Sequence, residues 1–95
     1  MLGRVGISAA DELPVKSLRE YDSVRIVHVS PDLGSHRVWE GSARPPQVGD
    51  VGSVIQLRQE RLRAPRYLVE CVTPDGRTLW MAEFDQTELE LTSRP

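Results

Sequence analysis

The sequence predicts an all-β domain, a small five-stranded barrel with a long first loop. Short runs of β-branched and other apolar residues recur along the chain, turn-forming residues separate them, and the last run alternates strictly between polar and apolar positions. The chain has 95 residues, of which 27% are charged and 39% are hydrophobic. This length fits a single domain and this composition is ordinary for a globular protein, so we expect one folded unit.

The N-terminal residues 1–16 show no helical or strand periodicity and contain two glycines and a proline. We therefore expect a flexible tail there, followed by the folded domain over residues 17–95. Ser17 and Glu20 have the spacing of a capping box, in which each side chain satisfies a free backbone amide. This pair predicts a single helical turn at the start of the domain.

The first strand is predicted over residues 23–29, where valine and isoleucine alternate with polar residues. If Arg25 faces water, the period of two places Val24, Ile26 and His28 on the opposite face. His28 is then interpreted as a histidine at the barrel edge or in a core hydrogen bond, in preference to a metal ligand.

The first loop, residues 31–47, is long enough to be either functional or disordered, since most loops in compact domains are shorter. Trp39 is its most informative residue, because an indole in a loop either packs back onto the barrel or anchors a partner. Arg37 and Arg44 flank it. Both interpretations of Trp39 stay open at this point.

The central turn and strand follow. Gly49 and Gly52 supply backbone freedom for a tight turn, and Asp50 can accept hydrogen bonds from nearby backbone amides. The next strand is predicted over residues 52–57. Residues 58–66 are rich in arginine, but Leu62 is their only sizeable apolar side chain, so they favour a polar hairpin loop over a helix.

The C-terminal part predicts three more strands. Residues 67–73 and 77–82 form a hairpin around the turn residues Asp75 and Gly76, which are typical of tight turns. A short turn or a single 3₁₀ turn is expected at residues 84–87. Residues 88–91 alternate between glutamate and leucine and predict a closing strand with its leucines inward.

Five short strands, a long first loop and a one-turn break before the last strand match a small SH3-like barrel. Residues 21–91 resemble a family of small bacterial domains of unknown function, which share a Val-Gly-Asp-Val-Gly-Thr-Val-Val turn and strand, a later Val-Glu-Phe-Val and Asp-Gly-Arg-Thr, and a leucine-rich end. The matching segments are residues 48–55, 69–72, 75–78 and 88–91. The resemblance implies the fold but no activity, because the family has none assigned.

Enzymatic chemistry is not expected. One cysteine and two histidines cannot supply the four usual zinc ligands, and no nucleophile motif accompanies the histidines. Cys71 is interpreted as a small buried apolar residue. The acidic residues near the end are expected to form a solvated edge, and these are Glu83, Asp85, Glu88 and Glu90. We expect no metal and no cofactor, and a cytoplasmic location, because no segment has the features of a secretory signal or a membrane span.

Charge is distributed unevenly. Residues 37–66 carry six arginines and three acids, whereas residues 67–95 carry two arginines and six acids. We therefore expect a protein-binding module, of the kind that neutralises or regulates a partner stoichiometrically, with Trp39 as its anchor. The flanking charges would be Arg37, Arg44, Arg61 and Arg63. The alternative is an RNA-binding module of the KOW type, which the turn at residues 48–52 resembles, although the sequence pI of about 5.6 argues against it.

Overall fold

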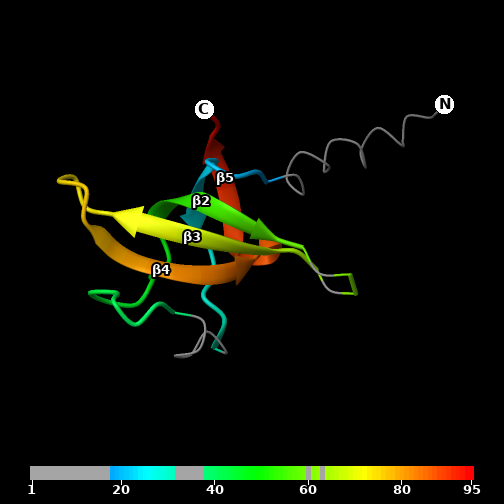
Figure 1. The fold of residues 1–95 in the computed structure, drawn as a ribbon, viewed down its shortest axis with the longest axis horizontal. Coiled ribbons are helices and arrows are strands. Elements are labelled where there is room, and N and C mark those ends of the chain that lie inside the picture. Colours follow the sequence, from blue (N-terminus) through cyan, green and yellow to red (C-terminus); the bar gives the residue numbers. More distant parts are fainter. Residues whose placement is uncertain (1–17, 32–37, 60, 63) are drawn as a thin grey trace.

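The structure is a computed structural model and describes residues 18–31, 38–59, 61–62 and 64–95. Five antiparallel strands form one sheet in the order β4-β3-β2-β1-β5, which confirms the predicted all-β class (Figure 1). The strands are β1 Ser23–Ile26, β2 Val51–Arg58, β3 Arg66–Val72, β4 Thr78–Asp85 and β5 Leu89–Ser93, and a 3₁₀ turn, η3, spans Gln86–Glu88. Within the described ranges no backbone pairing joins β4 to β5, so closure into a barrel stays a prediction.

The start of the domain differs from the expected helical turn. The predicted tail and Ser17 of the predicted capping box lie outside the described residues. Residues 18–22 form a turn in which the Arg19 amide donates to the Asp22 carboxylate at 2.8 Å. Asp22 therefore satisfies the Arg19 amide within a turn, and residues 18–22 form no helix.

The first strand is shorter than predicted, because β2 and β5, the two strands that pair with it, do not extend beyond Ile26. Beyond Ile26 the neighbouring chain is no longer β2 but the turn before it, where the Gly49 amide donates to the Ile26 carbonyl at 2.8 Å. On the other side, β5 begins only at Leu89, which pairs with Ile26. His28 consequently lies past the strand and is exposed, so its predicted place on the core face was wrong.

The fourth strand is longer than predicted and continues to Asp85. Its last residues pair with the first residues of β3, with Tyr67 opposite Phe84 and Arg66 opposite Asp85. Phe84, which we expected in a turn, is therefore fully buried in the core. The predicted 3₁₀ turn follows directly as η3, and Asp85 caps it by accepting the Thr87 amide at 3.1 Å.

The core is formed by side chains that alternate along the strands and point to one side of the sheet. Trp80 and Phe84 meet edge to face with ring centroids 5.8 Å apart, a preferred aromatic geometry. Cys71 is buried as predicted, and burial raises the pKa of its thiol. The buried apolar residues are Leu18, Val24, Ile26, Val54, Tyr67, Val69, Cys71, Trp80, Ala82, Phe84 and Leu89.

The glycines of the central turn have different roles. The Asp50 amide donates to the Gln47 carbonyl at 3.0 Å, and Gly49 occupies the third turn position with a φ of 97°, a value that favours glycine. Gly52 does not need such a φ. A Cβ there would lie 2.7 Å from the Glu70 carbonyl oxygen, so Gly52 permits the close approach of β3 to β2.

The β3–β4 hairpin has the predicted turn. The Gly76 amide donates to the Thr73 carbonyl at 2.8 Å, and Gly76 has a φ of 90°. The Thr73 hydroxyl contacts the Asp75 carboxylate, which also pairs with Arg77 at 3.2 Å. The predicted hairpin between β2 and β3 is present as well, since both strands reach its base at Arg58 and Arg66.

Among the described residues two acids are buried. Glu88, which we expected on a solvated edge, is only 1% exposed and accepts the backbone amides of Ser30 at 2.8 Å and Asp85 at 3.0 Å. Asp22 is also 1% exposed and accepts two hydrogen bonds from Arg94, at 2.9 and 3.0 Å. These bonds tie together the two ends of the described chain, and Figure 1 shows these ends lying side by side.

Candidate partner-binding surface

The first loop covers the free edge of β4. Val38 forms an isolated bridge with Ala82, and the Trp39 amide donates to the Met81 carbonyl at 2.8 Å. The loop then turns outward and returns to β4, where the Ala43 amide donates to the Leu79 carbonyl at 2.8 Å. Residues 38–43 therefore act as an additional short edge of the sheet, which fixes the position of Trp39 relative to β4.

The Trp39 side chain lies on Gly41. The Ser42 amide donates to the Trp39 carbonyl at 3.0 Å and closes a tight turn around Gly41. A Cβ at position 41 would lie 2.3 to 2.7 Å from three neighbouring atoms of the six-membered indole ring. Such similar distances place position 41 over the face of the ring and not beyond its edge. One face of the indole is therefore covered by Gly41, while Trp39 as a whole remains 50% exposed.

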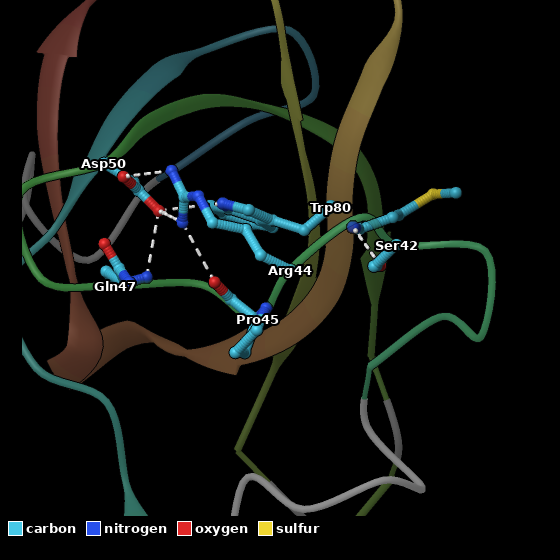
Figure 2. A network of polar contacts seen from close by, with 7 residues as sticks. Ser42, Arg44, Pro45, Gln47, Asp50 and Trp80 are labelled. Carbon is cyan, nitrogen blue, oxygen red and sulfur yellow. Dashed lines mark hydrogen bonds and ion pairs between the residues drawn. The ribbon is translucent and has the colours of Figure 1, made fainter.

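A polar network behind the loop is centred on Asp50 (Figure 2). Its carboxylate accepts the indole N–H of the buried Trp80 at 2.8 Å and the Gln47 amide at 2.9 Å. Arg44 donates to both carboxylate oxygens, at 2.9 and 3.1 Å, and also to the Pro45 carbonyl at 2.9 Å. Asp50 thereby joins the loop, the central turn and β4.

The contacts in this network favour the ionised forms of both Asp50 and Arg44. Burial raises the pKa of the Asp50 carboxyl, but the hydrogen bonds from Arg44, the Gln47 amide and Trp80 lower it by more, so that this pKa lies below its usual value. The hydrogen bond to Asp50 raises the pKa of the Arg44 guanidinium. Asp50 is therefore a charged structural hub, which extends its predicted role in the turn.

Of the predicted flanking arginines, the two that the structure describes, Arg44 and Arg61, do not lie beside the Trp39 ring. Arg44 points to Asp50, and Arg61 is exposed in the loop between β2 and β3. That loop adjoins Arg66, which pairs with Asp85, whereas Trp39 lies beside Met81. Asp85 and Met81 are four residues apart along β4, which corresponds to roughly 13 Å. Arg37 and Arg63 lie outside the described residues.

The base of the β2–β3 hairpin has its own ion pairs. Glu83 pairs with Arg58 at 2.6 Å, and its other oxygen lies 3.7 Å from the Nε of Arg66. Two of the six arginines between residues 37 and 66 thus share one carboxylate. With Arg44 on Asp50, three of these arginines are engaged within the chain.

We did not predict a structural polar role for three residues, Trp80, Asp22 and Glu88. The residues of the Trp80–Asp50 bond are 30 positions apart and those of the Asp22–Arg94 pair are 72 apart, so no local sequence motif indicates either contact. Glu88 had a local signal, since Asp85 and Glu88 have the spacing of a capping box, and both bonds of that box are present. Among the described residues no group of three or more histidine, cysteine, aspartate or glutamate side chains is arranged to hold a metal ion. No helix in the described ranges has the length and apolar character needed to cross a bilayer.

No protein-family model matches this chain, and no curated protein or solved structure does so either. The resemblance to a family of small bacterial domains therefore stays a prediction.

Proposed function

We propose that this protein is a non-enzymatic binding module that engages a protein partner through Trp39, as a stoichiometric neutraliser or a regulatory subunit. The observation that carries the proposal is an indole that is half exposed and yet fixed in place. The Trp39 backbone is hydrogen-bonded to Met81, and the indole ring lies against Gly41. A fixed aromatic side chain loses little conformational entropy on binding, which is the property of an interface anchor.

Nucleic-acid binding receives less support from the same residues. Backbone phosphates are bound by arginines and lysines that are free to reach them. Arg44, Arg58 and Arg66 instead form ion pairs with Asp50 or Glu83. Arg61 is the described arginine of this segment that forms none of these ion pairs, so it remains the candidate for a flanking charge at the rim of a protein interface.

Affinity capture from the native host, with nucleic acid digested beforehand, tests the proposal. Trp39→Ala should weaken the captured complex by about 2 kcal/mol or more, as expected for a truncated anchor, and leave the melting temperature unchanged. Tyr21→Ala is the matched control, because Tyr21 is 68% exposed and its amide bonds to Val54 of β2, two strands away from β4.

A parallel titration with single- and double-stranded oligonucleotides at two salt concentrations tests the nucleic-acid alternative. Tight binding that weakens steeply with salt would contradict the protein-binding proposal. Equal capture by the Trp39→Ala and Tyr21→Ala variants would contradict the role of Trp39.

A further inference from the structure

The open face of Trp39 has a defined chemistry. Because Gly41 lies against one face of the ring, a partner can approach only the other face or the ring edge. The face of an indole carries the negative part of its quadrupole and attracts cations more strongly than the other aromatic side chains do. No arginine of the same loop occupies it in the described residues, since Arg44 is turned toward Asp50 and the Pro45 carbonyl.

Among the described residues, the charged residue nearest to Trp39 in the sequence is an acid. Glu40 follows Trp39 directly in the chain, is exposed, and forms none of the ion pairs within the described residues. Six described arginines, in contrast, are already paired with acids of this chain. They are Arg25, Arg44, Arg58, Arg66, Arg77 and Arg94. The described arginines of the middle segment therefore do not make the surroundings of Trp39 basic, since Arg44, Arg58 and Arg66 are paired and Arg61 lies in the loop between β2 and β3.

We propose that the open face of Trp39, together with the Glu40 carboxylate, receives a cationic side chain, arginine or lysine, from the protein partner. This inference rests on the proposed function and names the chemistry of the partner's contact. The aromatic face and the carboxylate attract the same positive charge, so they act together. A guanidinium can also stack flat on the indole, which favours arginine over lysine.

Nona-arginine, nona-lysine and nona-glutamate peptides are suitable probes, and the backbone and indole N–H resonances of the full chain are suitable readouts. Nona-arginine should shift the Trp39 indole resonance and the Glu40 amide saturably, nona-lysine should do so more weakly, and nona-glutamate should leave both unchanged. Shifts spread over other acids with Trp39 unmoved would overturn the proposal.

Three variants and one control locate the effect. Trp39→Leu and Glu40→Gln should each weaken nona-arginine binding by about two- to fivefold, the range for an exposed cation–π contact or a single nearby charge. Gly41→Ala should do the same although Trp39 is retained, because the added methyl displaces the ring. The control is Glu20→Gln, which removes an exposed acid in the turn at residues 18–22. Equal affinities for the Glu40→Gln and Glu20→Gln variants would refute the role of Glu40.

The peptide titration tests the cation site and the capture experiment tests the proposed function, so a negative result in one can be distinguished from a negative result in the other. If a captured protein is lost with Trp39→Ala but nona-arginine leaves the indole resonance unmoved, protein binding stands and the cation site is refuted. If nona-arginine binds at Trp39 and capture yields no protein that depends on Trp39, the cation site stands and the proposed function is refuted.

Discussion

Replacing Asp50 with alanine removes the centre of the polar network and should destabilise the fold. It leaves the indole N–H of the buried Trp80 without its acceptor, which costs about 1 to 3 kcal/mol, and it removes the bond to the Gln47 amide, worth about 1 kcal/mol. Together these terms give about 2 to 4 kcal/mol before any loss of the ion pair with Arg44, whose side chain is about a third exposed to water, so that water partly screens the pair.

Thermal unfolding followed by circular dichroism measures this cost. For a domain of this size a loss of 1 kcal/mol lowers the melting temperature by roughly 4 to 8 °C, so Asp50→Ala should lower it by at least about 8 °C. Asp75→Ala is the matched control, because Asp75 is also a turn carboxylate paired with an arginine but lies in an exposed hairpin. Equal shifts for the two variants would refute the hub role.

A double-mutant cycle with Trp80→Phe separates the indole contribution. Phenylalanine has no N–H to leave unsatisfied, so Asp50→Ala should cost less in the Trp80→Phe background than in the wild type. The pH dependence provides a second check. Because the pKa of Asp50 is lower in the folded state than in the unfolded chain, its charge stabilises the protein above the unfolded pKa of about 4, and that advantage is lost as the pH falls through the folded value. The difference between wild type and Asp50→Ala should therefore shrink below about pH 4.

Four further predictions concern stability and reactivity. Gly52→Ala should cost about 1 to 3 kcal/mol by overpacking against β3, and Gly49→Ala about 1 to 2 kcal/mol through its positive φ alone, both measured by thermal unfolding. Arg94→Ala should destabilise the protein at pH 7 and progressively less as the pH falls below about 4 in urea titrations, because the hydrogen bond from Arg94 holds the pKa of Asp22 below its usual value. Cys71 should react with a disulfide reagent only slowly in the native protein and quickly in urea, because burial raises the pKa of its thiol.

The strands were predictable because each is a short run of β-branched and aromatic residues bounded by turn residues. Their ends were not, because a strand ends where its partners end. The fourth strand continues to Asp85 because β3 begins at Arg66 and its first residues require partners. Likewise β1 stops at Ile26, where β2 gives way to a turn. Information of this kind resides in the register between segments that are distant in sequence.

The candidate site was predictable only in part. Trp39 was identified because an aromatic residue in a long polar loop is conspicuous, and its backbone lies on β4 with its ring half exposed. The choice of Arg44 as a flanking charge rested on proximity in sequence, but a carboxylate six residues later engages its guanidinium. Side-chain direction within a loop depends on such contacts, which spacing alone does not determine.

The same loop combines a stabilising contact with the proposed anchor, and this allows the two roles to be separated. Pairing with Met81 and Leu79 fixes the loop along β4, and the Asp50 network holds its return through Arg44. Trp39 lies between these attachments and contributes an exposed ring whose removal leaves both intact. Trp39→Ala should therefore weaken binding by about 2 kcal/mol or more without loss of stability. Asp50→Ala should lower both, because an untethered loop must be ordered again when the partner binds, at a cost in conformational entropy.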